Sequence, residues 1–164
     1  MANFVLISKH IQLAAAWTGS GTEPGGTVAP ASIAGTLDTP SNLSPFVHSG
    51  AEPGSSAAMQ TKTNFGSQGF EEFLPGLKAG DDIVLNMYGD YTTLHGIIVT
   101  TLGGLGAFVY GDIKATSASR GAGNPSFVFG AYIMGDTKIQ GAVGDVAGRT
   151  VSLKVTGTFA DLAS

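Results

Sequence analysis

The chain has 164 residues, no cysteine and a formal net charge of −4. This length suits one domain that buries a core without help from a metal ion or a disulfide. The absence of cysteine excludes a disulfide framework, a thiolate nucleophile and a Cys-ligated zinc site. With only 8 Lys and Arg residues, the chain lacks the clustered positive charge that tight nucleic-acid binding needs. We predict a single domain over residues 1–164.

The chain is poor in charge for its size. Charged residues make up 12% of it, about half the usual share, and 25 residues are glycine. Charge normally keeps protein surfaces apart, so a neutral surface favours contacts between subunits. Lys9-His10 interrupts the apolar run at residues 4–7, and no run approaches the ~18 apolar residues of a membrane-spanning helix. We expect no export signal and no membrane partner.

Proline and glycine are frequent from about residue 18 to 58. The prolines in this segment are Pro24, Pro30, Pro40, Pro45 and Pro53. Proline inside a helix removes a backbone hydrogen bond, so the segment excludes a long helix. An irregular stretch of this length in a small domain is typical of a functional arm or a binding loop. We predict an extended arm or loop within about 18–58.

In three later segments the side chains follow a pattern with a period of two residues, which is typical of β-strands. Residues 83–88 and 150–159 place apolar side chains on one face. Residues 127–134 also alternate but are more apolar, which predicts a strand covered on both faces.

Two shorter strands and a loop are predicted around these. Residues 107–113 form one strand, and residues 138–146 are expected to pair with the last strand through the turn at Gly148. The Ser-, Ala- and Gly-rich segment 115–125, which carries Arg120, is predicted to be an exposed, mobile loop. The number of strands favours a β-sandwich or barrel.

One segment has helical spacing instead. Its apolar residues are Leu94, Ile97, Ile98 and Leu102. Asp90 or Thr92 can cap the N-terminus, and Gly103-Gly104 can end the helix. The β-branched residues of 97–101 favour a strand. We predict one short helix that flanks the sheet.

Residues that could carry chemistry are scattered. His10, His48 and His95 have no second ligand at metal-binding spacing, so packed or surface roles are favoured. The adjacent carboxylates Glu71-Glu72 and Asp81-Asp82 would point to opposite faces of a strand and would not form an acid–base pair. The sequence lacks motifs for a serine nucleophile, a phosphate loop or a dinucleotide fold. We predict no enzyme, no catalytic residue, no metal site and no cofactor.

The tyrosines and the tryptophan lack the basic neighbours of a base-stacking surface, so they are predicted to pack in a core or an interface. They are Trp17, Tyr88, Tyr91, Tyr110 and Tyr132.

The most specific stretch of sequence runs from Thr61 to Ile83. It reads T-K-T-N-F-G-S-Q-G-F-E-E-F-L-P-G-L-K-A-G-D-D-I. A Thr-rich strand leads into E-F-L-P-G-L-K-A-G and then into an alternating strand, and in this the chain resembles bacteriophage major tail tube proteins of the long-tailed, siphophage type. The resemblance extends over roughly residues 59–159 and includes the closing V-S-L-K-V-T-G at 151–157.

That resemblance implies a fold and a function. It implies a mainly β fold of the tail tube type, a sandwich or barrel with one short flanking α-helix, here joined to a long N-terminal arm or loop. Tail tube proteins form rings, usually hexameric, that stack into the conduit for DNA delivery. The chain would be a virion protein assembled in the host cytoplasm. Its partners would be itself, the tape measure protein, the tail terminator and the tail tip proteins.

Genomic DNA would pass through such a tube without specific binding. The acidic composition suits this, because a lumen with net negative charge would repel phosphates.

The motif is also the candidate site. We hypothesise that residues 70–77 form a turn whose Pro75-Gly76 fixes the chain direction and whose Phe73 and Leu74 pack at a core or subunit boundary. A tight connection inside one subunit is the alternative. The candidate turn or subunit-interface residues are Phe70, Glu71, Glu72, Phe73, Leu74, Pro75, Gly76 and Leu77. A second hypothesis is that residues 36–69, with the N-terminal arm, bridge between rings.

Two other classes of protein stay open at this point. Another virion protein, such as a tail terminator or a capsid decoration protein, would share the composition but cap or coat instead of polymerising. A small β-sandwich binding module or hydrolase would need exposed aromatic residues or paired carboxylates in a cleft, and the sequence shows no such cluster.

Overall fold

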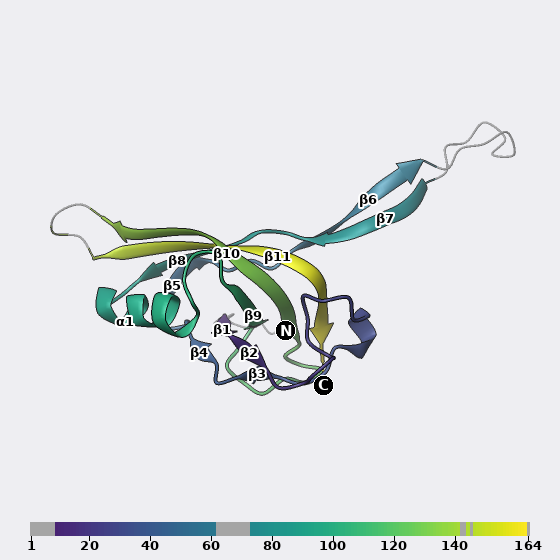
Figure 1. Ribbon diagram of the computed structural model, residues 1–164, viewed down its shortest axis with the longest axis horizontal. Coiled ribbons are helices and arrows are strands. Elements are labelled where there is room, and N and C mark those ends of the chain that lie inside the picture. The colour runs from purple at the N-terminus through teal and green to yellow at the C-terminus, as the bar shows by residue number, and fades with distance from the viewer. Residues whose placement is uncertain (1–8, 62–72, 142–143, 145, 164) are drawn as a thin grey trace, which may run out of the picture.

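The computed structural model describes residues 9–61, 73–141, 144 and 146–163 (Figure 1). Most of these residues fold around one curled, antiparallel sheet of seven strands. In spatial order the strands are β4 (Ser41–Asn42), β1 (His10–Ala14), β9 (Phe108–Lys114), β10 (Ser126–Gln140), β11 (Gly148–Leu162), β8 (Ile83–Tyr88) and β5 (Val47–Gly50). The prediction of a mainly β fold is confirmed.

Two small ribbons and one helical segment complete the architecture. The ribbons are β2 (Ala16–Trp17) with β3 (Leu37–Asp38), and β6 (Ser55–Thr61) with β7 (Phe73–Gly80). The helical elements are the short 3-10 turn η1 (Pro30–Ser32), α1 (Tyr91–His95) and the π-helical segment η3 (Gly96–Thr101). Among the described residues, no helix has both the length and the apolar character that crossing a membrane requires.

Strand β8 follows the alternating pattern of its sequence. Ile83, Leu85 and Met87 are buried in the core, while Val84 and Tyr88 are exposed on the opposite face. Because successive side chains of a strand point to opposite faces, the pattern fixes which face meets the core. The predicted strand at residues 83–88 is confirmed.

Strands β10 and β11 are longer than predicted. Residues 126–131 of β10 are buried on both faces, as their apolar pattern indicates. Tyr132 and Met134 are exposed, so the prediction of a strand covered on both faces is wrong for the end of the range 127–134. The far end of β10 reaches Gln140, which pairs with Gly148 of β11. Residues 138–140 therefore pair with the last strand as the end of β10, but Gly148 lies in β11, so the predicted turn at Gly148 is wrong.

The predicted helix is also present. The Asp90 carboxylate accepts a hydrogen bond from the Thr93 backbone N–H at 2.8 Å, so Asp90 is the N-cap. Leu94, Ile98 and Leu102 are buried against the sheet. Burial of this apolar stripe outweighs the strand preference of the β-branched residues, because packing supplies most of the stability of a short helix.

A buried ion pair ties β10 to β11. Arg149 donates from Nε to Asp136 Oδ1 at 2.9 Å and from Nη2 to Asp136 Oδ2 at 2.7 Å. The two side chains are only 1% and 3% exposed. Such a pair has lost its hydration, so its two members stabilise the fold only together.

The segment predicted as an arm, within 18–58, is folded onto the sheet over much of its length. It contains β3, β4, β5 and η1, and its last residues belong to β6. The loop 115–125 also contacts the segment. Arg120 donates from Nη1 to the Gly35 carbonyl at 3.3 Å, and its Nη2 lies 3.7 Å from Asp112 Oδ2. The Arg120 side chain is only 14% exposed, which corrects the prediction of an exposed loop at this residue.

Replacing Arg149 by Met should lower the free energy of unfolding by about 3–5 kcal/mol, because the Asp136 carboxylate would stay buried without a partner. Urea denaturation followed by circular dichroism measures this loss. The double variant Arg149→Met/Asp136→Leu should recover most of it, since no buried charge remains.

The control is Lys154→Gln, which removes an ion pair with Asp82 whose side chains are more than half exposed. It should cost less than about 1 kcal/mol. An Arg149→Met variant no less stable than this control would contradict the assigned role of the buried pair.

Acidification should weaken the helix cap. Hydrogen bonds from the Thr93 N–H and then from its hydroxyl hold the pKa of Asp90 below its ordinary value. The stabilisation is therefore complete above the ordinary carboxyl pKa and is lost as the pH falls through the lowered one. The variant Asp90→Asn keeps a side-chain acceptor but has no carboxylate to protonate, so its melting temperature should fall less on acidification than that of the parent chain. Thermal unfolding at several pH values measures this, and an identical dependence on pH in the two proteins would refute the role of Asp90.

Candidate subunit interface

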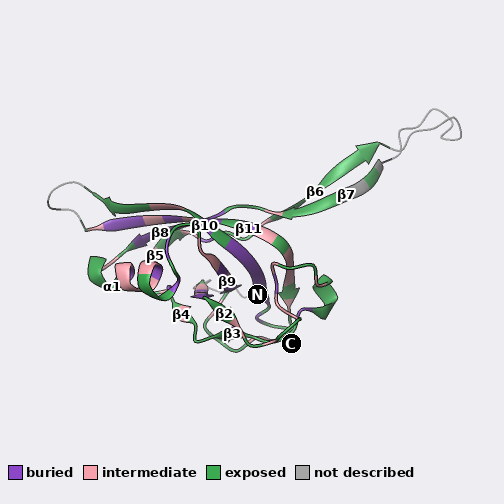
Figure 2. Cartoon of the chain, in the orientation of Figure 1, coloured by how far each residue is buried: buried purple, intermediate pink, exposed green. Residues whose placement is uncertain are grey.

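The β6–β7 ribbon extends away from the sheet (Figure 1). Every residue of β6 is exposed, and Figure 2 shows this exposure along most of the ribbon. Three of its large apolar side chains face solvent: Met59 is 68% exposed, Leu74 46% and Leu77 87%. Among the described residues, β6 and β7 pair only with each other. A two-stranded ribbon is marginally stable by itself, so these features point to contact with another chain.

The predicted motif supplies β7 of this ribbon. Residues 70–72 lie outside the described part of the chain. Residues 73–77 lie in β7, where Pro75 pairs with Met59. The prediction that residues 73–77 form a turn is therefore wrong. Leu74 is half exposed, so it does not pack in the core of its own subunit.

An irregularity in pairing explains why proline and glycine occur in this strand. Ala57 pairs with Lys78, whereas Met59 pairs with Pro75, so β7 holds an additional residue at the Gly76-Leu77 position. Both strands of an isolated ribbon are edge strands, and edge strands tolerate proline and bulges. Proline and glycine often indicate a turn, but at this position they belong to a bulged edge strand.

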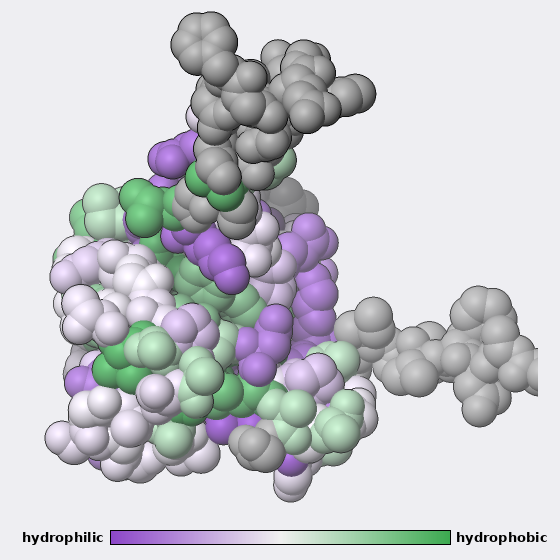
Figure 3. Space-filling view, turned by 90° about the vertical axis from the view of Figure 1, so that its right-hand side faces the viewer, coloured by the Kyte–Doolittle hydropathy of each residue, from purple (hydrophilic) through white to green (hydrophobic). Residues whose placement is uncertain are grey.

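The base of the ribbon is packed tightly against β11. A Cβ atom at Gly80 would lie 2.4 Å from the Val155 side chain, so only glycine permits this approach. Asp81 donates its backbone N–H to the Gly54 carbonyl at 3.0 Å across the base. Figure 3 shows this end of the molecule, where pale, weakly polar surface is extensive and strongly hydrophilic residues form limited groups.

The face of the sheet opposite α1 and η3, called here the helix-free face, has one half that is covered by other parts of the chain and one half that is open. The open half comprises the outward side chains of β8 and of residues 130–137 and 148–156. Thr150 Oγ1 lies 3.1 Å from Asn86 Oδ1 and 2.9 Å from Gln140 Oε1, forming a polar row across three strands. At its end the Tyr88 ring stacks on His48, with ring centroids 3.8 Å apart.

Residues 18–36 cover part of the other half. Gly25 donates its N–H to the Thr158 carbonyl at 2.6 Å, and Thr158 donates its N–H to the Gly26 carbonyl at 3.1 Å. A Cβ atom at Gly25 would lie 2.7 Å from the Phe108 ring, so the backbone lies directly on the sheet there. The segment is thereby fixed to β9, β10 and β11.

An aromatic cluster packs around this covered half. It consists of Trp17, Phe108, Tyr110 and Tyr132, whose successive ring centroids are 5.1–5.8 Å apart. Burial raises the pKa of the Tyr110 hydroxyl, and the Glu23 carboxylate raises it further. Three of the aromatic residues singled out in the sequence therefore pack together within the subunit.

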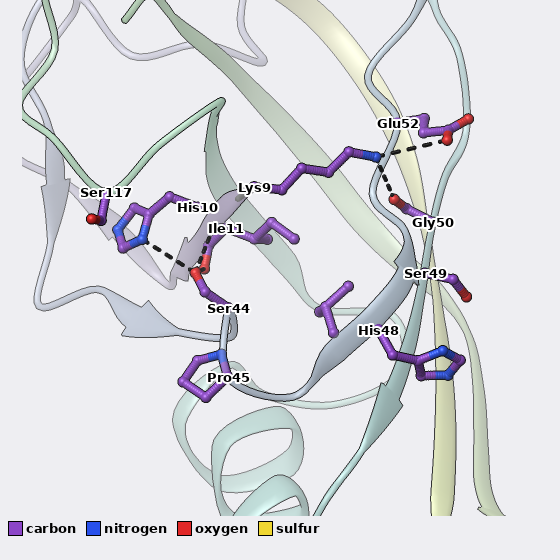
Figure 4. A pocket seen from close by; sticks show the side chains of 11 residues that line it. Lys9, His10, Ile11, Ser44, Pro45, His48, Ser49, Gly50, Glu52 and Ser117 are labelled. Carbon is purple, nitrogen blue, oxygen red and sulfur yellow. Dashed lines mark hydrogen bonds and ion pairs between the residues drawn. The ribbon is translucent and has the colours of Figure 1, made fainter. Parts of the chain in front are cut away.

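A hollow of about 800 Å³ lies between β1 and β5 (Figure 4). The Lys9 side chain crosses this hollow. Its Nζ donates a hydrogen bond to the Gly50 carbonyl at 2.9 Å and lies 3.7 Å from Glu52 Oε1. His10 Nδ1 lies 3.2 Å from Ser44 Oγ, while His48 points away from them in Figure 4. Ser44 also accepts the Ile11 N–H, so it holds the chain between β4 and β5 on β1.

The remaining candidate groups are dispersed. In the described part of the chain, no group of three or more His, Asp or Glu side chains could hold a metal ion. Asp82 pairs with Lys154, whereas the Asp81 carboxylate lies beside Gly54. These two carboxylates therefore have separate neighbours. Glu71-Glu72 lies outside the described residues.

Replacing Gly157 by Ala should detach the covering segment. Gly157 has φ +62°, and a Cβ atom there would meet the Gly25 carbonyl oxygen at 2.2 Å. We expect a lower melting temperature and a red-shifted emission of Trp17, the only tryptophan. Gly26→Ala is the matched control, since no atom lies within 4 Å of its added Cβ atom; equal effects of the two substitutions would contradict the assignment.

Comparisons with known proteins bear on the whole fold. No protein-family model matches the chain, and no curated protein matches it. A chain in the six-fold symmetrised baseplate of the anti-feeding prophage is similar, with a TM-score of 0.56 and 9% identity; the match covers 99% of this chain and 97% of that one. A chain of the SPP1 tail tube is similar with a TM-score of 0.50 and 13% identity, covering 96% and 78%.

Both likenesses extend over nearly the full length of the present chain, so they include its sheet, helix and ribbon. Identities this low relate the chains by fold. The fold predicted from the sequence motif between Thr61 and Ile83 is therefore confirmed: the chain has an architecture similar to that of a tail tube protein.

Proposed function

We propose that this chain is a structural subunit that associates with copies of itself to form the rings of a phage tail tube. The observation that carries the proposal is the β6–β7 ribbon, which exposes Met59, Leu74 and Leu77. Similarity in fold to a tail tube chain supports it. The ribbon would gain stability on another subunit, because association removes its apolar side chains from water.

A second copy of the chain is the partner that the surface chemistry favours. The described part of the ribbon carries a single charge, at Lys78. In the proposed assembly the ribbon contacts a different surface of the neighbouring copy, which makes the interface head-to-tail. Such interfaces generate closed rings or open filaments, the two geometries that a tube combines.

In the proposed assembly the helix-free face lines the lumen, and hexameric rings stack to conduct DNA. The tape measure, tail terminator and tail tip proteins would be the other partners, and the virion tail would be the location. Electron microscopy of purified protein distinguishes this function from that of a terminator or decoration protein. Stacked rings or open-ended tubes support the proposal, whereas single caps or coats would favour the alternative.

Deleting part of the segment 36–69, such as residues 40–56, would not test whether it makes contacts between rings. Leu43 and Ala51 are fully buried, and β5 is part of the sheet. A deletion over this range would therefore disrupt the subunit itself. Single substitutions on the ribbon avoid this difficulty because its side chains are exposed.

Leu77→Lys should prevent tube formation and leave the subunit folded. An ammonium group buried at an interface without a partner costs about 3 kcal/mol or more, which corresponds to at least a hundred-fold rise in the concentration needed for assembly. Sedimentation and negative-stain microscopy measure assembly, and circular dichroism monitors the fold.

Leu105→Lys is the matched control, since Leu105 is 66% exposed outside the ribbon. It should assemble like the parent chain. Normal tubes from Leu77→Lys, or an equal defect in both variants, would show that the ribbon is not the interface.

A further inference from the structure

The open half of the helix-free face is almost without charge. Its strand residues 83–88, 130–137 and 148–156 contain three charged side chains: Asp136, Arg149 and Lys154. Asp136 and Arg149 pair with each other in the interior. Of these three charged side chains, only Lys154 points outward. Its neighbours in β11, Leu153 and Val155, are buried. The other outward side chains on β8 and β11 include Val84, Asn86, Tyr88, Thr150, Ser152 and Thr156.

A carboxylate accompanies this one cation. Lys154 Nζ lies 2.9 Å from Asp82 Oδ1, and the two side chains are 59% and 57% exposed. The sheet keeps them together, because Asp82 directly precedes β8 and Ile83 of β8 pairs with Leu153 of β11. An exposed pair adds little to stability. Its effect on the surface is different: beyond a few ångströms the two charges cancel.

We propose that Asp82 neutralises Lys154 so that the open half of the helix-free face does not retain DNA phosphates. This inference rests on the proposed function, in which the face lines a DNA conduit. A ring would repeat Lys154 once per subunit, and a ring of unpaired ammonium groups would bind the phosphates and release their counterions. A row of hydroxyl and amide groups with no net charge binds phosphate weakly.

This mechanism differs from the electrostatic repulsion expected from the acidic composition. The net charge of −4 belongs to the whole chain, whereas within the three strand ranges named above the outward Lys154 is balanced by Asp82, the residue before β8. Passage of DNA would then depend on the local neutrality of the face. A single carboxylate would maintain that neutrality in each subunit.

The test is Asp82→Asn, which leaves Lys154 without its carboxylate. DNA affinity is measured by fluorescence anisotropy with short duplexes at several NaCl concentrations. We expect the parent protein to bind too weakly to measure, and Asp82→Asn to bind at low salt. Each new phosphate contact should steepen the log–log salt dependence by about 0.9. Adding Lys154→Gln to Asp82→Asn should abolish the binding.

Asp161→Asn is the matched control, because it makes the same change in net charge at an exposed residue near the other end of β11. It should bind DNA no better than the parent. Equal gains in the two variants, or no gain in Asp82→Asn, would overturn the inference. Electron microscopy of the same samples decides separately whether tubes form, so failure of the proposed function is distinguishable from failure of this inference.

Discussion

The pairing of β10 with β11 is the interaction on which the rest of the subunit depends. These two 15-residue strands pair from Ser126 opposite Leu162 to Gln140 opposite Gly148. β9 pairs with one outer edge and β8 with the other, so both sides of the sheet are built on this hairpin. The buried Arg149–Asp136 pair joins its two strands where they extend beyond β9. Buried side chains of both strands form part of the core, and the base of the β6–β7 ribbon packs on β11.

Sequence patterns predicted the elements in which buried residues recur at a fixed, short spacing along the chain. The alternation in β8 and the helical spacing of Leu94, Ile98 and Leu102 each place one face against the core, so local sequence contains the information. The turn predicted at Pro75-Gly76 was wrong because turns and bulged edge strands use the same residue types. The covering of the sheet by residues 18–36 was not predictable either. Its contact between Gly25 and Thr158 joins residues that no short pattern connects.

The low charge content has a structural counterpart. In the described part of the chain, four basic residues lie in ion pairs, which are Lys9 with Glu52, Arg120 with Asp112, Arg149 with Asp136 and Lys154 with Asp82. Besides Lys154 and Asp82, the open half of the helix-free face presents mainly hydroxyl, amide, aromatic and apolar groups, and the described part of the ribbon carries a single charge, at Lys78. Composition predicted an associating surface without placing it on the chain, whereas the fold offers the exposed β6–β7 ribbon as the candidate.

The bonds between Gly25-Gly26 and Thr158 also constrain the order of events during synthesis. Residues 18–36 leave the ribosome long before β11, yet their binding surface consists of β9, β10 and β11. Until the C-terminal strand is translated, this early segment has no place to dock, and the aromatic cluster beneath it stays uncovered. Strand β11 therefore completes the docking surface of a segment made much earlier, and residues 18–36 reach their folded position only after β11 has been made.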